Sequence, residues 1–411
     1  MQTLRNASIT SVPGFRASGI YCGIKPDPQR LDLAVIVSEN PASAAAVFTT
    51  NRFKSAHILY DQEVLRTSAS AIRAVVINSG CANACTGARG VENARETARA
   101  AAEAAGLPPD SVLVMSTGVI GVQLPMEKIL AGIPQAVGAL SADGGHAAER
   151  AIMTTDTRPK EAAVRVALPD GREVTIAGMA KGAGMIHPNM ATLLAVIATD
   201  ARIAPELLQK MITKAADASF NRISVDGDTS TNDTLLLLAA GGPDAPAIVA
   251  DDAAAVQAFM RGLKKVAARL AKKVVMDGEG ASKFIAIRVK GARTAEEARR
   301  AANAIATSCL VKTAFFGEDP NWGRILSAVG NSGIEVDPAR TDLYFLNSVG
   351  KRLQLVSAGT PLNYDEGQAH EMLTGRKVGV LVNLRLGHGR SVVWASDLSY
   401  DYVKINAHYR T

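Results

Sequence analysis

The sequence predicts a mixed α/β fold (mixed α+β), in which mixed β-sheets carry helices on their outer faces. Short apolar runs rich in β-branched residues recur along the whole chain. Two long segments of Ala, Lys and Arg have helical spacing in the second half. The expected strands outnumber the helices that could connect them as simple βαβ units, which favours mixed sheets. The length of 411 residues suggests about two to three structural units.

The first part of the chain, up to about residue 53, is expected to form strands and turns. LDLAVIVSE and SAAAVFTTN are strand-like runs, and Gly and Pro residues punctuate this region. AIRAVVINSG predicts a further strand. A loop of Gly, Asn and Ala follows at 78–90, and a helix is expected at 91–105, where Gly106 and two following prolines end it. SVLVMSTGVIG then predicts a strand that enters a tight loop.

The middle of the chain predicts two strands that flank a Gly-rich loop, within REVTIAGMAKGAGMIHPNMATLLAVIATD. A helix is expected at 205–218, with proline in its first turn. RISVDGDTSTNDTLLLLAA predicts a polar turn between two strands, and an exposed loop is expected at 241–255. Two long helices at 251–273 and 295–308 and a C-terminal part of strands and loops complete the prediction.

The composition excludes several classes of protein. Hydrophobic residues make up 47% and charged residues 20% of the chain, which excludes an intrinsically disordered or collagen-like protein. The formal net charge is +6, but the densest basic stretches, 261–273 and 293–300, alternate with Ala and Leu at helical spacing. We therefore expect solvated helix faces there and no nucleic-acid partner.

The chain is expected to be a cytoplasmic protein. The first residues lack the apolar region of a secretory signal, and no run approaches 18 apolar residues, so neither export nor membrane insertion is expected. The four cysteines, Cys22, Cys81, Cys85 and Cys309, match no zinc framework and are too few for a disulfide scaffold. We therefore expect reduced thiols and no structural metal.

Several standard catalytic motifs are absent. The chain has no GxxxxGK[ST] phosphate loop, no GxGxxG fingerprint, no GxSxG elbow and no HExxH. Its six histidines are scattered. His187 lies in the Gly-rich loop, where a lone histidine is more often structural or solvated than a ligand contact.

The motif VDGDTST resembles the way in which aspartyl phosphotransferases place a nucleophile and a Mg²⁺ ligand. Asp226, Asp228 and Asp233 also carry the hard oxygen ligands that suit Ca²⁺. The partners that a phosphotransferase needs do not follow in the expected order, however. A turn whose Asp, Ser and Thr side chains accept from local backbone N–H groups is the favoured interpretation.

The segment KGAGMIHPNMATLLAVIATD carries the strongest chemical signal. Lys181 and two nearby glycines form a cationic turn, and Thr192 stands at the start of an almost wholly apolar strand. A threonine there is usually only a β-former. On a strained backbone, however, its hydroxyl can attack the carbonyl of Ala191 in an N→O acyl shift, and hydrolysis then frees Thr192 as a new N-terminus. The free α-amine, with a pKa of about 7.7–8.0, can accept the proton of the hydroxyl.

Many stretches of the chain resemble the ornithine acetyltransferase family of arginine biosynthesis, the glutamate N-acetyltransferases. KGAGMIHPNMATLLAVIATDA is similar to the self-cleavage segment of that family. Further blocks occur in family order, namely GFRASGIYCGIK, DLAVIVSENPASAAAVFTTN, VVINSGCANACTG, VMSTGVIG, MTTDTRPK, NRISVDGDTSTNDTLLLLA, DGEGASKFI, GEDPNWGRILSAVGNSG and DYVKINAHYRT. The match covers essentially the whole chain, which makes it far more specific than any one motif.

This resemblance implies a ping-pong reaction with a threonine nucleophile. The Ala191–Thr192 bond would be the site of self-cleavage, and the Thr192 hydroxyl would take the acetyl group from N-acetylornithine and pass it to glutamate. Thr117 and Gly118, in STGVIG, would form the oxyanion hole. The implied substrate-binding residues are Thr155, Lys181, Thr192, Glu279, Asn406 and Thr411.

The resemblance also implies an assembly of two kinds of chain. Residues 1–191 would form an α chain and residues 192–411 a β chain, joined as a dimer of αβ pairs. No metal and no bound organic cofactor is implied, and the use of acetyl-CoA as a second donor is left open. Cys81 stands where many relatives have Asn, a small polar exchange in a loop.

Some assignments stay open at this point. Thr154 and Thr157 are alternatives to Thr155, and Glu279 could bind the side-chain ammonium of ornithine or the attacking amine. A hydrolase with the same threonine and water as acceptor, an amidohydrolase or aminopeptidase, is the first alternative activity. A metal-dependent phosphotransferase built on Asp226 and Asp228 is the second, and a non-catalytic binding protein is the third.

Overall fold

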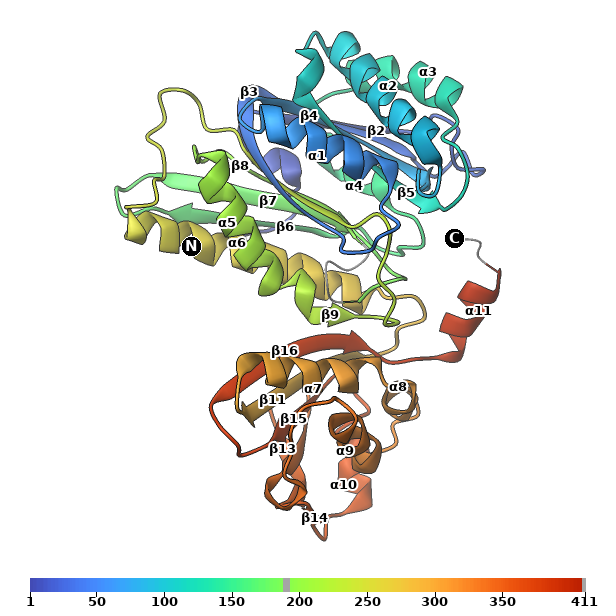
Figure 1. Cartoon of the computed structure of the whole chain (residues 1–411), viewed down its shortest axis with the longest axis vertical. Helices are drawn as coiled ribbons and strands as arrows, with labels where there is room; N and C mark the ends of the chain where they lie inside the picture. The colour runs from blue at the N-terminus through green and yellow to red at the C-terminus, as the bar shows by residue number, and fades with distance from the viewer. Residues whose placement is uncertain (188–192, 409–411) are drawn as a thin grey trace.

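The structure is a computed structural model that describes residues 1–187 and 193–408. Within these ranges the chain forms two mixed sheets with helices packed around them (Figure 1). The larger sheet and its helices occupy the upper two thirds of the view, and the smaller sheet lies below them. The predicted fold class is confirmed.

The larger sheet is built around one long central strand. Its described strands, in spatial order, are β1 (Gln2–Leu4), β6 (Glu161–Ala167), β7 (Glu173–Lys181), β8 (Leu194–Thr199), β10 (Thr234–Ala239), β3 (Leu33–Phe48), β4 (Ile72–Cys81) and β5 (Val112–Val119), with β2 (Phe15–Ile20) paired to β3. The first half of β3 pairs with β2 and β4, whereas its second half pairs with β10. The two strand-like runs expected at the N-terminus are therefore one continuous strand, which joins the two halves of the sheet.

Helices cover both halves of this sheet. Those over the β2–β5 half are α1 (Ala56–Ser68), α2 (Gly87–Ala105), α3 (Met126–Gly138) and α4 (Gly145–Ile152). Those over the β6–β10 half are α5 (Pro205–Asp217) and α6 (Ala253–Met276). Short 3₁₀ helices lie at Ile9–Ser11, Pro109–Ser111, Phe220–Arg222 and Pro338–Arg340. Gly106 ends α2 in the left-handed conformation, with φ of 62°, as its position after the Ala-rich run predicts.

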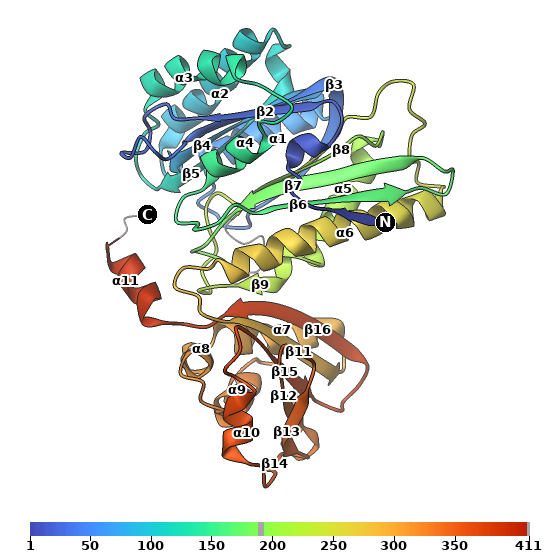
Figure 2. The same ribbon diagram turned by 180° about the vertical axis from the view of Figure 1, so that it is seen from behind.

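The smaller sheet belongs mainly to the last third of the chain. Its described strands, in spatial order, are β14 (Thr360–Pro361), β13 (Arg352–Ser357), β12 (Asp342–Leu346), β15 (Lys377–Asn383), β11 (Phe284–Ala292), β16 (Gly389–Ser396) and β9 (Ile223–Ser224). The helices of this region are α7 (Ala295–Thr307), α8 (Cys309–Phe316), α9 (Trp322–Gly330), α10 (Glu366–Glu371) and α11 (Tyr400–His408). Helix α7 packs on β11 and β16, whereas α11 extends away from the smaller sheet toward the larger one (Figures 1 and 2).

The two sheets are connected by contacts as well as by the chain. Strand β9 precedes β10 in sequence but pairs with β16 of the smaller sheet, where Trp394 lies opposite Ile223. Trp394 also packs against the apolar core under α5 and α6. The Nζ of Lys272 lies 4.6 Å from the centroid of the Trp394 ring. These contacts hold the segment before β10 in place from both sides.

Most predicted elements are confirmed, and several helices were missed. The predicted helices correspond to α2, α5, α6 and α7, and the basic stretch 261–273 lies on α6 with Arg261, Lys264 and Arg269 exposed. Helices α1, α3 and α4 were not predicted, and the expectation of strands and loops alone at the C-terminus was wrong, because α8 to α11 also lie there. Helix α3 carries Pro134 in its interior, which normally disfavours a helix.

Two further expectations concern cysteines and membranes. Cys22, Cys81, Cys85 and Cys309 are all free thiols, as predicted. Across residues 1–187 and 193–408, no helix has both the length and the apolar character that a membrane-spanning helix needs.

Replacing Phe259 by Ala should lower the free energy of unfolding by about 3–5 kcal/mol, because the side chain on α6 is completely buried in the core beside β6, β7 and β8. Leu310→Ala is the matched control, since Leu310 on α8 is 62% exposed and its removal should cost less than about 0.5 kcal/mol. Urea denaturation followed by circular dichroism measures both. Equal losses for the two variants would contradict this account of the core.

Candidate active site

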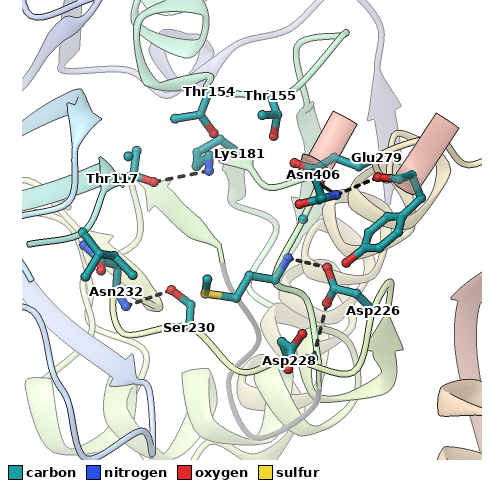
Figure 3. A pocket seen from close by; sticks show the side chains of 15 residues that line it. Thr117, Thr154, Thr155, Lys181, Asp226, Asp228, Ser230, Asn232, Glu279 and Asn406 are labelled. Atoms are coloured by element: carbon teal, nitrogen blue, oxygen red, sulfur yellow. Dashed lines mark hydrogen bonds between the residues drawn. The ribbon is translucent and has the colours of Figure 1, made fainter. Parts of the chain in front are cut away.

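A pocket of about 230 Å³ lies where the ends of several elements of the larger sheet meet α11. Strand β5, the loop after α4, the end of β7, the segment before β10, the loop after α6 and α11 all contribute to it (Figure 3). Its described lining residues are Thr117, Gly118, Ile120, Thr154, Thr155, Lys181, Gly184, Met185, Asp226, Asp228, Ser230, Asn232, Glu279, Tyr402 and Asn406. The pocket thus collects residues from across the whole chain.

Six residues to which the family resemblance assigns a role line this one pocket. They are Thr117, Gly118, Thr155, Lys181, Glu279 and Asn406. Ala191, Thr192 and Thr411 lie outside the described residues. His187 is not among the lining residues, and its Nδ1 lies 3.3 Å from the hydroxyl of Ser224.

Gly118 allows an unusually close approach between β4 and β5. The two strands are parallel, with Gly80 opposite Gly118. Gly118 has φ of 134°, and a Cβ atom placed there would lie 2.3 Å from the carbonyl carbon of Gly80. Only glycine fits such a position, because both the backbone conformation and the space exclude a side chain. The end of β5 is thereby fixed where it enters the pocket.

Asn232 supports the same end of β5 from the other side. Its Nδ2 donates to the backbone oxygens of Ala82 at 2.6 Å and Ser116 at 2.7 Å. Thr117 follows directly, so a buried amide holds the backbone that presents this threonine. From the sequence, Asn232 is recognised only as part of the family block NRISVDGDTSTNDTLLLLA, although it also lines the pocket.

Lys181 brings a positive charge into the pocket from the end of β7. Its Nζ donates to the Oγ1 of Thr117 at 3.3 Å. An ammonium group cannot accept a hydrogen bond. The hydroxyl hydrogen of Thr117 therefore points away from Lys181 and can be donated to an atom in the pocket. Burial lowers the pKa of Lys181, whereas the charge of Asp156 opposes that shift.

The loop after α4 presents neighbouring threonines with different roles. Thr154 and Thr155 both line the pocket. Thr157 points elsewhere, because its hydroxyl and its backbone N–H both donate to the carboxylate of Asp277. The three candidates from the sequence are therefore reduced to Thr154 and Thr155.

Helix α11 completes the pocket opposite Lys181. The Nδ2 of Asn406 donates to the Oε2 of Glu279 at 2.8 Å, which connects the helix to the loop after α6. Tyr402 also lines the pocket, and burial raises its pKa above the ordinary value. Sequence analysis missed Tyr402, although it stands four residues before Asn406 and therefore on the same face of the helix.

The VDGDTST motif and Asp233, two residues after it, fix backbone on both sides of residues 188–192. The carboxylate of Asp226 accepts from the N–H groups of Met185 at 2.5 Å and Ile186 at 2.8 Å. The Oδ1 of Asp233 accepts from the N–H of Leu193 at 2.9 Å. Burial raises the pKa of Asp226 to about 6.

These bonds refine the interpretation of the motif as a local turn. Asp226 does accept from the nearby N–H of Asp228, at 3.3 Å, but its shorter bonds reach about 40 residues back along the chain. Its oxygens are thus engaged by backbone donors. Within the described ranges, no group of three His, Cys, Asp or Glu side chains is placed to hold a metal ion.

The charges of the pocket suit a zwitterionic ligand. Lys181 is the single cation among the described lining residues, and the lining carboxylates are Asp226, Asp228 and Glu279. Figure 3 shows Lys181 on one side of the pocket and these acidic residues on the other. Such a site can receive a carboxylate at one end and an amino group at the other.

Comparison with known proteins is consistent with this geometry. Residues 16–411 match the model of the ArgJ family. The chain belongs to this family. It is 51% identical over 98% of its length to a Geobacter sulfurreducens protein named "Arginine biosynthesis bifunctional protein ArgJ", all of which is covered. A protein of the same name from Symbiobacterium thermophilum is 48% identical, with 98% of both chains covered.

A solved structure is also similar to the chain. It is described as ornithine acetyltransferase from Mycobacterium tuberculosis complexed with ornithine, and its chain is 42% identical in sequence. The alignment covers 47% of the present chain and 99% of that chain, with a TM-score of 0.42. The family model and the curated relatives show that the resemblance stated from the sequence corresponds to membership of the ArgJ family.

Gly118→Ala should lower the free energy of unfolding by about 1–3 kcal/mol more than Gly121→Ala, because only the former forces side-chain atoms into a neighbouring strand. Gly121 is the matched control: its φ of 81° is also positive, but no atom lies within 4 Å of an added Cβ. Chemical denaturation of both variants provides the comparison. Indistinguishable midpoints would show that β4 and β5 do not need this close contact.

Proposed function

We propose that the chain is an ornithine acetyltransferase of arginine biosynthesis, which moves the acetyl group of N-acetylornithine to glutamate. The names of the curated relatives, which cover nearly the whole chain, support this activity. The observation that carries the proposal is the meeting of Lys181, Thr117 and Gly118 in one pocket with Glu279 and Asn406 opposite. Acyl transfer between amino acids needs this combination of a carboxylate-binding cation, oxyanion donors and a group that binds an amine.

The proposed chemistry proceeds through an ester on Thr192. The α-amine of Thr192 takes the hydroxyl proton while the oxygen attacks the acetyl carbonyl of N-acetylornithine. The C–N bond then breaks, the departing ornithine amine takes the proton, and an acetyl-Thr ester remains. The amino group of glutamate attacks this ester, N-acetylglutamate leaves, and the hydroxyl is restored. One difficult amide exchange is thereby divided into two easier steps.

The oxyanion of each tetrahedral intermediate is assigned to Thr117 and Gly118. The Thr117 hydroxyl is free to donate, because its oxygen already accepts from Lys181. The backbone at Gly118 is held in place by its close contact with Gly80. Fixed donors of this kind contribute most when they need no rearrangement during the reaction.

The substrate groups are assigned by charge. Lys181 binds the α-carboxylate that N-acetylornithine and glutamate share, whereas Glu279, oriented by Asn406, binds the substrate amino group. Thr155 and Thr411 complete the substrate contacts in this proposal, with Thr154 as the alternative to Thr155. The Mycobacterium tuberculosis structure is a complex with ornithine, and we propose that this chain binds ornithine as well.

The nucleophile is generated by cleavage of the Ala191–Thr192 bond, which gives an α chain of residues 1–191 and a β chain of residues 192–411. Strand β8, just after the bond, is hydrogen-bonded to β7 on one side and to β10 on the other. Strand β10 pairs in turn with β3. Strands β8 and β10 of the β chain thus lie between strands of the α chain within one sheet, which supports a stable αβ pair. We extend the proposal to a dimer of such pairs in the cytoplasm.

No metal and no bound organic cofactor takes part in this scheme. The relatives are named bifunctional, which supports acetyl-CoA as a second acetyl donor. The same threonine ester would form from the thioester. A hydrolase is the first alternative, and it differs only in that water replaces glutamate as the acceptor.

Consumption of N-acetylornithine should depend on glutamate, because the acetyl group needs an amine acceptor to leave Thr192. Ornithine and N-acetylglutamate should appear in equal amounts when both substrates are supplied, as measured by liquid chromatography with mass detection. Glutamine, which lacks the side-chain carboxylate, is the matched control acceptor. Equal consumption of N-acetylornithine with and without glutamate would show that the enzyme is a hydrolase and not a transferase. Loss of activity with a chelator and an uncleaved chain would instead favour the phosphotransferase.

Thr192→Ala should abolish both chain cleavage and acetyl transfer, because it removes the only hydroxyl that the proposed mechanism uses as a nucleophile. Mass spectrometry should find one polypeptide of 43.0 kDa in the variant and two pieces of about 20 and 23 kDa in the wild type. Thr192→Ser is the matched control, since it keeps a hydroxyl and should retain some of both functions. An uncleaved but fully active Thr192→Ala protein would refute the mechanism.

A further inference from the structure

A row of alternating buried charges runs from the pocket into the interior. Lys160 lies at its centre, with its Nζ 2.5 Å from the Oδ1 of Asp156 and 2.6 Å from the Oδ2 of Asp277. The side chains of Lys160 and Asp156 are almost completely buried, with relative exposures of 1% and 0%. Lys181 lies at the pocket end of this row, because it lines the pocket and the N–H of the next residue, Gly182, donates to Asp156. Neither Asp156 nor Lys160 lines the pocket itself.

The carboxylate of Asp156 connects the two segments that carry Thr155 and Lys181. Its Oδ1 accepts from the N–H of Gly182 at 2.7 Å, directly after Lys181. Its Oδ2 accepts from the N–H of Thr154 at 2.9 Å, directly before Thr155. A single buried side chain thus fixes the distance between two walls of the pocket.

Among the described residues, Asp156 forms its ion pair with Lys160 and none with Lys181. Both carboxylate oxygens are already engaged by two backbone N–H groups and Lys160. Among the described residues, the only hydrogen bond from the Lys181 ammonium goes to Thr117. The negative charge therefore acts on Lys181 without occupying its donors, which remain available to a ligand.

We propose that Asp156 is a positioning residue for the acetyl-transfer site, which aligns Lys181 with Thr155 and supplies the negative charge that faces Lys181. The inference rests on the proposed function, because it takes Lys181 as the group that binds the substrate carboxylate. It adds a role for a residue that touches neither substrate nor the reacting atoms.

Several charged groups act on Lys181 together with burial. Burial lowers the pKa of Lys181, and the positive charge of Lys160 lowers it further. Asp156, Glu279 and Asp233 raise it, with Asp156 the foremost of the three. Burial alone would raise the pKa of Asp156, but the charges of Lys160 and Lys181 hold it below the ordinary value, so Asp156 is ionised.

These groups determine how the binding of substrate depends on pH. Lys181 binds a carboxylate only as the ammonium, so KM stays low below the pKa of Lys181 and rises as the pH passes above it. Removing the negative charge of Asp156 lowers that pKa, and the rise in KM then begins at a lower pH. Removing the positive charge of Lys160 has the opposite effect on the pKa of Lys181.

Asp156→Asn tests the inference in the cleaved enzyme, with KM and kcat for both substrates measured from pH 6 to 9. We expect the rise in KM to move about one to two pH units lower than in the wild type, for N-acetylornithine and glutamate alike. Each unit corresponds to about a tenfold increase in KM on the alkaline side. kcat should change less than KM, because the reacting groups are untouched.

Asp277→Asn is the matched control. It removes the other carboxylate that holds Lys160, but Asp277 accepts from Thr157 and Arg158 and makes neither of the two bonds, to Thr154 and Gly182, by which Asp156 joins the pocket walls. It should lower the thermal midpoint of unfolding without moving the pH at which KM rises. Identical pH profiles for the two aspartate variants would overturn the inference.

Asp156→Glu decides the question if Asp156→Asn does not fold. It keeps the negative charge that faces Lys181 but lengthens the side chain that joins Thr154 to Gly182, so KM should rise at every pH while the pH at which KM begins to rise stays close to that of the wild type. Wild-type KM values at every pH in Asp156→Glu would overturn the inference. Failure of the wild type to transfer acetyl groups to glutamate would instead overturn the proposed function, so the two failures are distinguishable.

Discussion

The site depends on keeping one ammonium group charged in a place that has little water. Lys181 stands at the end of a buried strand with only 4% of its surface exposed. A lysine in that position tends to lose its proton, because the interior solvates the charge poorly. The surrounding architecture opposes that tendency with a row of carboxylates that are themselves fixed by lysine and backbone donors. The pocket is therefore an extension of a buried ionic network.

The backbone contributes as much to the site as the side chains do. The near contact of Gly118 with Gly80 places the end of β5, and Asn232 holds the residue before Thr117. Asp226 and Asp233 accept from backbone N–H groups on the two sides of residues 188–192. Aspartates whose sequence pattern resembles a metal or nucleophile site thus anchor backbone. Few side chains remain to take part in the chemistry. Hydrogen bonds from Asn232 and Asp156 hold the backbone beside Thr117 and Lys181.

Much of this arrangement could be predicted from the sequence, and the failures have physical reasons. Strands such as β7 and β8 are runs of apolar residues with clear turns beside them, and their pattern is local. Helix α3 was missed because Pro134 and two glycines weaken its pattern, although its buried face stabilises it in the fold. Six of the pocket residues were available through family blocks, whereas the link from Asp156 to Gly182 depends on tertiary packing that no local pattern reveals.

The order of strands in the larger sheet also affects how the protein can fold during translation. The second half of β3 emerges early from the ribosome, yet the partner of Ala44 in β10 is Leu238, which is synthesised much later. Until then, an apolar strand edge of the nascent chain lacks its partner, and such edges are prone to aggregation. The pairing of β3 with β10 is therefore expected to be a late and slow step of folding, because contacts between segments distant in sequence form slowly.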